Sequence, residues 1–178
     1  KSPGPLVFRH KCLKIQQRHS ESGSIRHLST PQHNELSAAE SIGEMIIMGT
    51  GTSIGVPVVG CRCNVCLSDN PRNRRMRTGV LVRAPEGEFV IDAGPELRLQ
   101  LVRERATLIR AAVMTHAHAD HIMGLDDCRR FCDQRGGEAV PLYACETTMN
   151  NLRRVYAYAF HDGPWPRGYF LPEPHIIT

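Results

Sequence analysis

The sequence has no long hydrophobic run and little net charge, and each shortage excludes a class of protein. No apolar run approaches the ~20 residues that cross a bilayer, and no signal-peptide core is visible. The net charge of +4 is spread along 178 residues, too weakly to indicate nucleic-acid binding by itself. We therefore expect a cytoplasmic protein that works without membrane or nucleic acid.

The cysteines are too unevenly placed for a secreted disulfide framework. The chain has seven, an odd number, and three of them crowd into Cys61–Cys66. This favours metal thiolates in a reducing compartment. The Cys-x-Cys-x-x-Cys spacing of Cys61, Cys63 and Cys66 suits one tetrahedral zinc, with a fourth ligand from elsewhere. The alternative is three free thiols in a loop.

Residues 1–43 lack the periodicity that would bury a face, and they lack an initiating Met. We interpret them as a disordered tail, a basic targeting segment or sequence from outside the natural domain. At this chain length one domain is expected, over residues 44–178.

The rest of the chain predicts alternating strands and helices, which indicates an α/β layered fold. A glycine-rich loop (49–57) follows the first strand, and it either turns tightly or cradles a phosphate. No Gly-Lys-Ser/Thr follows, so the nucleotide-binding P-loop interpretation is weak. The sequence predicts strands at 45–48, 79–84, 88–91, 111–114 and 140–144, the last near a sheet edge because of its proline, and helices at 95–106, 122–134 and 146–160.

The densest group of metal-binding residue types is Thr115–His121, directly after the apolar run 111–114. His116 and His118 are two residues apart, so on an extended turn both can reach one cation. Asp120 and His121 can reach a second cation beside it. Imidazole with one carboxylate suits zinc, whereas calcium prefers oxygen. The alternative is a histidine-rich surface turn.

This loop, with Gly124-Leu125 after it, resembles the metal-binding motif of the metallo-β-lactamase superfamily. Gly49–Ser53, Gly55–Pro57 and the three cysteines are similar to its phosphoribosyl cyclic phosphate phosphodiesterase branch. The resemblance implies an αββα sandwich, with mainly its N-terminal half present. It assigns one catalytic metal to His116 and His118 and the other to Asp120 and His121. It also implies hydrogen-bond support of the loop by Asp92, and a structural zinc on Cys61, Cys63, Cys66 and a late histidine.

The resemblance further implies a metal-dependent hydrolase that cleaves a small cyclic or nucleotide-like phosphodiester with a metal-bridging hydroxide. Asp120 is the expected catalytic residue, and Zn2+ is expected at two catalytic positions and one structural position, with Mn2+ as the catalytic alternative. Other hydrolases of the superfamily, acting on a thioester, a lactam or an RNA end, stay open. So does a non-catalytic, truncated metal-binding fragment.

Few candidate ligands follow the histidine loop. Only His161 and His175 come after His121, and no aspartate follows Asp162 to bridge two metals. We therefore expect this chain by itself to hydrolyse phosphodiesters near background. An uncovered second layer should also leave Val80, Leu81, Val90 and Ile91 exposed, which favours aggregation or a homodimer.

Overall fold

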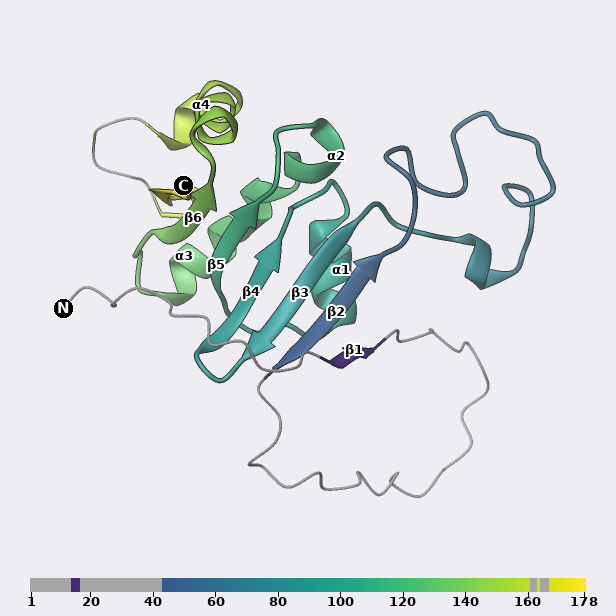
Figure 1. Ribbon diagram of the computed structural model, residues 1–178, viewed down its shortest axis with the longest axis horizontal. Helices are drawn as coiled ribbons and strands as arrows, with labels where there is room; N and C mark the ends of the chain where they lie inside the picture. Colours follow the sequence, from purple (N-terminus) through teal and green to yellow (C-terminus); the bar gives the residue numbers. More distant parts are fainter. Residues whose placement is uncertain (1–13, 17–42, 161–162, 164–166) are drawn as a thin grey trace, which may run out of the picture.

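The fold is built on one mixed β-sheet whose strands follow one another in chain order. The computed structural model describes residues 14–16, 43–160, 163 and 167–178. The strands of the sheet are β1 (Lys14–Gln16), β2 (Glu44–Gly49), β3 (Gly79–Ala84), β4 (Gly87–Ile91), β5 (Ile109–Met114), β6 (Val140–Ala144) and β7 (Pro172–Ile176). β2, β3 and β4 pair antiparallel, whereas β1 with β2, and β4 through β7, pair in parallel (Figure 1). The predicted α/β class is confirmed.

The parallel edge of the sheet agrees in part with the prediction. We expected the proline-containing strand at 140–144 to lie near an edge, and β6 is next to the edge strand, between β5 and β7. Pairing of β6 with β5 begins only at Leu142, so the missing N–H of Pro141 removes no bond from that ladder. The sequence pattern missed two of the described strands, β1 and β7. β7 has two prolines of its own and forms an edge, where proline is tolerated.

The helices are shorter and more broken than predicted. They are α1 (Leu97–Arg103), α2 (Ala119–Ile122), α3 (Arg129–Gln134) and α4 (Glu146–Val155), with 3-10 turns η1 (Pro71–Asn73), η2 (Leu125–Cys128) and η3 (Ala157–Ala159). The single helix predicted over 122–134 is wrong. At Gly124 the backbone N–H donates to the Ala93 carbonyl at 2.8 Å instead of continuing α2.

The helix predicted over 146–160 also ends early. Tyr156 leaves the helical conformation, with φ −110 and ψ 40, and its hydroxyl donates to the Ile122 carbonyl at 2.6 Å. The helical spacing of apolar residues over 146–160 predicts Val155 on the core face, but its side chain is 44% exposed. The spacing over 95–106 likewise predicts Val102 on one face with Leu97 and Leu101, but the buried positions of α1 are Leu97, Gln100 and Leu101. These are spaced i, i+3 and i+4, so Val102 lies off that face.

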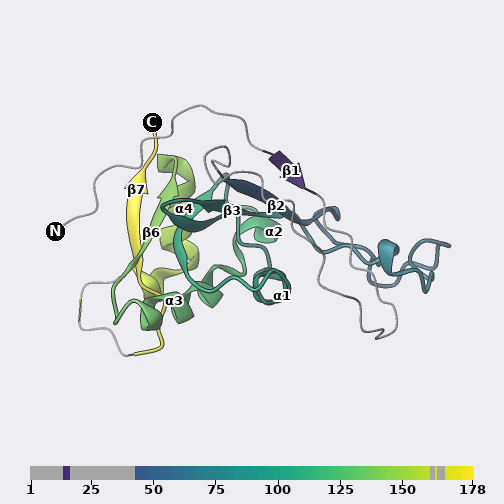
Figure 2. The ribbon, with the colours of Figure 1, turned by 90° about the horizontal axis from the view of Figure 1, so that it is seen from below.

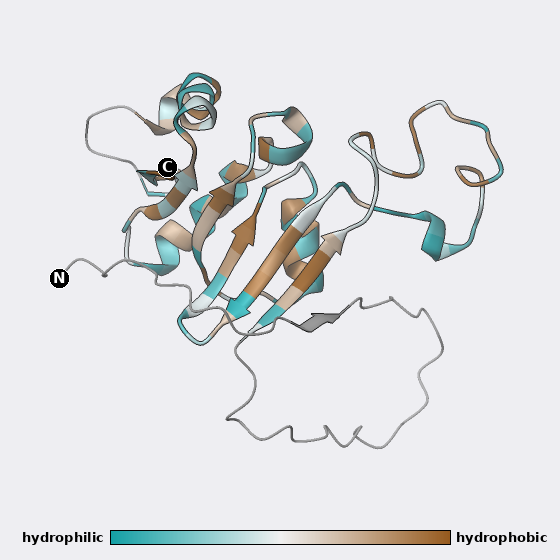
Figure 3. Ribbon diagram, in the orientation of Figure 1, coloured by the Kyte–Doolittle hydropathy of each residue, from teal (hydrophilic) through white to brown (hydrophobic). Residues whose placement is uncertain are grey.

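The two faces of the sheet differ in burial. One face packs in the same core as the helices, and α1 and α3 lie on one side of the sheet (Figures 2 and 3). Its side chains are at most 2% exposed, namely Ile46, Met48, Leu81, Val90, Ala112, Met114, Leu142 and Ala144. On the other face the paired row of Ile47, Val80, Ile91, Val113 and Tyr143 is half-buried.

This alternation corrects the expectation that Val80, Leu81, Val90 and Ile91 are exposed together. Successive side chains of a strand point to opposite faces. Leu81 and Val90 therefore point into the core at 0% exposure, and only Val80 and Ile91 lie on the half-buried face.

Residues 50–78 form an arm that projects from the end of the sheet between β2 and β3 (Figure 2). Its two strands of backbone are joined near the base by Gly51 N–H to Met76 carbonyl, 2.8 Å, and by a bridge between Val56 and Arg75. Arg77 fixes the base to the body. Its guanidinium donates to the Ser53 carbonyl at 3.0 Å and to a Glu96 carboxylate oxygen at 2.6 Å, just before α1. The arm is therefore anchored at its base and otherwise extends from the domain.

Several expectations concern segments outside this description. The proposed division at residue 43 falls mostly on such segments, although Lys14–Gln16 pairs with β2. His161 and Asp162 also lie outside the described residues. Within the described part, no helix combines the length and the apolar character that crossing a membrane requires.

Candidate metal centre

The histidine loop begins where β5 leaves the core. Ile109, Ala112 and Met114 of β5 are at most 2% exposed, and the chain then turns at Thr115. His118 is the N-cap residue of α2, with φ −73 and ψ 150, so the backbone is still extended between His116 and His118. Asp120 and His121 lie on the first turn of α2. The predicted buried strand that delivers the loop is confirmed.

Asp92, directly after β4, lies behind this loop. It is 5% exposed and has a positive φ of 61, a conformation that aspartate tolerates better than most residues. Its Oδ1 accepts the Thr115 N–H at 2.8 Å, and its Oδ2 lies 2.7 Å from His121 Nδ1. Because a carboxylate only accepts, the proton of this second bond belongs to His121 Nδ1. Asp92 therefore makes the hydrogen bonds to the loop that the resemblance implied.

Two glycines let the segment after β4 approach the backbone of α2 closely. A Cβ added at Gly94 would lie 2.5 Å from the Asp120 carbonyl oxygen, and one at Gly124 would lie 2.0 Å from the Gly94 carbonyl oxygen. The two segments are joined by a hydrogen bond, in which the Ala93 N–H donates to the His121 carbonyl at 2.6 Å. The position of His121 is thus set by backbone contacts.

Two pairs of donor atoms face each other on the loop. His116 Nε2 lies 3.1 Å from His118 Nδ1, and His121 Nε2 lies 3.2 Å from Asp120 Oδ2. Two lone pairs at such distances repel unless a positive charge, from a proton or a metal ion, lies between them. The His116 and His121 ring centroids are 4.0 Å apart, so the two pairs are adjacent. This donor set fits two neighbouring cations of the zinc class.

Asp92 is also close enough to be considered as a ligand. Asp92, His116 and His121 each offer a ligand atom, and these atoms lie within 4.8 Å of one another. However, the Asp92 oxygens already accept from the Thr115 N–H, the Thr115 hydroxyl and His121. We therefore interpret Asp92 as a support of the loop, and the assignment of ligands to His116, His118, Asp120 and His121 stays a prediction.

The three cysteines of the arm come together. The sulfur atoms of Cys61, Cys63 and Cys66 lie within 4.8 Å of one another, and Val58 N–H donates to Cys66 Sγ at 3.4 Å. The Cys66 backbone N–H, helped by the Cys61 thiol, lowers the pKa of Cys63 to about 7. In Cys66 itself the Val58 N–H lowers the pKa, but desolvation and the two neighbouring thiols raise it on balance. The group offers three thiolate ligands, and within the described residues no histidine or carboxylate completes it.

The other candidate residues lie apart from both groups. Cys128 and Cys132 are buried and pack as small apolar residues, and burial raises the pKa of both thiols. His175 stacks on Tyr143, with ring centroids 4.7 Å apart, and belongs to neither group. Sequence reasoning missed Thr115, whose side chain lies 3.0 Å from His116 Nδ1. Its place between a buried strand and the first histidine was the available signal.

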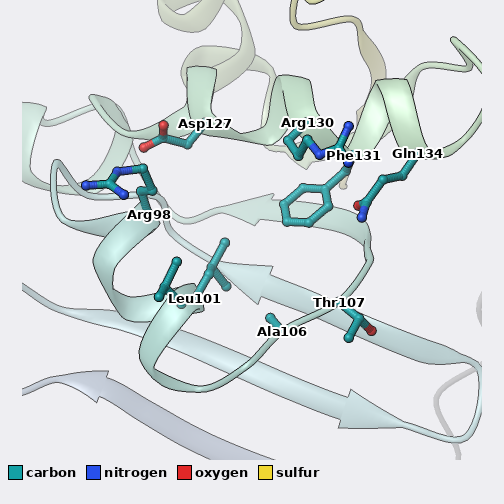
Figure 4. A pocket seen from close by; sticks show the side chains of 9 residues that line it. Arg98, Leu101, Ala106, Thr107, Asp127, Arg130, Phe131 and Gln134 are labelled. Carbon is teal, nitrogen blue, oxygen red and sulfur yellow. The ribbon is translucent and has the colours of Figure 1, made fainter.

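A pocket of about 190 Å³ opens between α1 and α3 on the helix side of the sheet (Figure 4). Apolar and charged side chains line it together, namely Arg98, Leu101, Val102, Ala106, Thr107, Asp127, Arg130, Phe131 and Gln134. Because it contains none of the predicted ligands, we do not include it in the metal centre.

Residues 88–172, which include the histidine loop, match the family model described as the Beta-lactamase superfamily domain. The chain is 37% identical over 122 residues to an octanoyltransferase of Porphyromonas gingivalis strain W83, a match that covers 68% of this chain and 24% of that protein. A crystal structure of a diphosphatase from the PhnP family is 42% identical, with a TM-score of 0.66, over 75% of this chain and 50% of that one. Zn2+-bound PqqB from Methylobacterium extorquens is 21% identical, with a TM-score of 0.57, over 75% and 49%.

The chain thus spans half or less of each of these proteins, and the likeness to PqqB concerns the fold alone. The family match and the similarity to the diphosphatase agree with the arrangement of the sheet and the histidine loop. From these observations together, the chain carries a domain of the metallo-β-lactamase superfamily.

Proposed function

We propose that the chain carries the metal-binding part of a metal-dependent hydrolase that cleaves a small phosphodiester. The observation that carries this proposal is the pair of facing donor sets on one loop, His116 with His118 and Asp120 with His121. The relative that is 42% identical is a diphosphatase, which supports a phosphorus centre as the site of attack.

In this proposal His116 and His118 hold one cation, and Asp120 with His121 hold the other. Cations bound there would lower the pKa of water and would take up negative charge on the phosphate oxygens. Asp120 directs Oδ2 toward His121, and its other oxygen can accept a hydrogen bond from the attacking water. Asp92 holds the His121 proton at Nδ1 and so keeps Nε2 directed at Asp120.

The arm has a different task in this proposal. Cys61, Cys63 and Cys66 hold a structural zinc that orders residues 50–78, because the arm contributes little apolar core of its own. Val59 and Leu67, for example, are 100% and 65% exposed. The arm and the histidine loop therefore bind metal for separate purposes.

Metal content and turnover together test the proposal. Metal content is measured on this chain, and turnover on the whole protein that contains it, since relatives are longer. Bis(p-nitrophenyl) phosphate, a nucleoside diphosphate, a thioester and a β-lactam form the substrate panel. His116→Ala with His118→Ala should remove about one metal equivalent and abolish phosphodiester hydrolysis. Asp120→Asn should lose most turnover and keep the metal on His116 and His118.

Cys63→Ser serves as the matched control, because it removes a metal from the arm and leaves the loop unchanged. Phosphodiester turnover that survives the double histidine replacement would contradict the proposal. Preferential turnover of the thioester or the lactam would move the chain to another hydrolase of the superfamily.

A further inference from the structure

Thr115 lies between the buried carboxylate of Asp92 and the first histidine of the loop. Its hydroxyl oxygen is 2.8 Å from Asp92 Oδ2, 3.0 Å from Asp92 Oδ1 and 3.0 Å from His116 Nδ1. The Thr115 backbone N–H also donates to Asp92 Oδ1 at 2.8 Å. Backbone and side chain of Thr115 are therefore fixed to the same carboxylate.

The single hydroxyl proton decides how this group is connected. A hydrogen bond to a carboxylate is stronger than one to a neutral nitrogen, so the Thr115 hydroxyl donates to Asp92. The hydroxyl oxygen is then left as an acceptor toward His116 Nδ1. His116 consequently carries its proton on Nδ1, and its Nε2 lone pair is directed at His118 Nδ1, 3.1 Å away.

We propose that Thr115 is a positioning residue whose hydroxyl joins the Asp92 carboxylate to His116 and fixes that ring as the Nδ1–H tautomer. This row of hydrogen bonds, from Asp92 through Thr115 to His116, forms a relay. Asp92 does the same for His121 directly, through the 2.7 Å bond to its Nδ1. One buried carboxylate therefore presents Nε2 of both histidines, one in each donor pair. Residue 115 thus needs a hydroxyl as well as a size that fits the turn.

The statement that this relay prepares a metal site rests on the proposed function. The statement that His116 is the Nδ1–H tautomer does not. In the metal-free chain the His116 tautomer depends on Asp92, Thr115, His116 and His118, and it can be measured directly. For this reason the two statements can fail separately.

The experiment compares the chain, labelled with 15N-histidine and freed of metal, with Thr115→Val, Thr115→Ser and Thr147→Val. Val removes the hydroxyl at nearly the same size, Ser keeps it, and Thr147 is an exposed residue of α4 outside the loop. Long-range 1H–15N correlation spectra at about pH 8.5, where an ordinary imidazole is neutral, report which ring nitrogen carries the proton. The His116 signal is identified as the one missing from His116→Asn.

We expect His116 as Nδ1–H in the native chain, in Thr115→Ser and in Thr147→Val. In Thr115→Val the His116 proton should move to Nε2, while His121 keeps its proton on Nδ1 because its bond to Asp92 is direct. Zinc affinity, measured by competition with a chromogenic chelator, should fall about 10- to 100-fold in Thr115→Val only.

A native His116 with its proton on Nε2, or a tautomer unchanged by Thr115→Val, would overturn the relay. If the tautomers follow the expectation but the native chain binds no zinc, the relay stands and the proposed function fails. If zinc binds with equal affinity in the native chain and in Thr115→Val, the role of Thr115 in preparing the metal site is refuted.

Discussion

Replacing Gly124 by alanine should separate the two loops that position His121. The φ of Gly124 is −99, which any L-residue adopts, so alanine suffers no backbone strain there. Without a steric contact, such a replacement should stabilise the fold by about 0.4–1 kcal/mol, because it restricts the unfolded chain. The expected sign therefore depends on the contact alone.

The contact is severe. The new Cβ would lie 2.0 Å from the Gly94 carbonyl oxygen and 3.0 Å from Leu97 Cβ, whereas ordinary contact begins at 3.4 Å. The loops would have to part by roughly 1.4 Å, the difference between 3.4 and 2.0 Å. That movement stretches the hydrogen bonds from Gly124 N–H to Ala93 and from Ala93 N–H to His121, now 2.8 and 2.6 Å. We expect a loss of about 2–4 kcal/mol in the free energy of unfolding.

Urea unfolding of the metal-free chain, followed by circular dichroism, measures this loss. Gly94→Ala meets a second contact between the same two segments, at 2.5 Å from the Asp120 carbonyl oxygen. The double variant should cost less than the two single losses together, since loops already apart accept the second methyl. Gly136→Ala is the control for backbone strain without a steric contact, because Gly136 has φ +76 and no atom lies within 4 Å of the added Cβ. It should lower the free energy of unfolding by about 1–2 kcal/mol. A Gly124→Ala chain as stable as the native one, or more stable, would refute the packing argument.

Three further predictions concern the arm and the core. Cys63→Ser should lower bound zinc by about one equivalent per chain and lower the melting temperature, while Cys145→Ser, an exposed thiol outside the group, should change neither. In metal-free protein, the pKa of Cys63 is lowered to about 7, so the rate of its alkylation by iodoacetamide should be half-maximal near that pH and should fall at lower pH. Peptide mass spectrometry distinguishes Cys63 from the buried Cys128, whose raised pKa should keep that thiol unmodified. Tyr156→Phe leaves the buried Ile122 carbonyl without its donor at 2.6 Å and should lower the free energy of unfolding in urea by about 1–3 kcal/mol. The control is Tyr158→Phe, because the Tyr158 hydroxyl bonds to Asp126 at the surface and its loss should cost less. Equal losses would contradict the assigned burial.

The sequence indicated β2 to β6 well because each of them is a short apolar run with a buried face. Leu81 and Val90 alternate with Val80 and Ile91, and the period of two is visible without a structure. The helices were harder. Apolar residues at helical spacing continue past Ile122 and past Val155, but Gly124 and Tyr156 each make a bond to a distant segment that ends the helix. Such bonds are tertiary and leave no local pattern.

The candidate site divides in the same way. His116, His118, Asp120 and His121 were named from spacing alone, because four metal-binding side chains within six residues seldom occur together by chance. Thr115 was given no role of its own, since a threonine after a strand has many uses. Its hydroxyl matters only because Asp92, 23 residues earlier, lies against it. That proximity follows from the parallel pairing of β4 with β5, in which Ile91 lies beside Val113.

Burial of Asp92 links the stability of the fold to the geometry of the loop. A carboxylate that is 5% exposed is costly unless donors replace its water, and here the donors all come from the loop that it supports. The loop therefore cannot move away without leaving a buried charge unpaired. A cation on the Nε2 side of His116 and His121 would polarise both rings and strengthen their Nδ1–H bonds toward Asp92, directly or through Thr115. Metal binding and folding should thus favour the same arrangement, because each stabilises the hydrogen bonds on which the other depends.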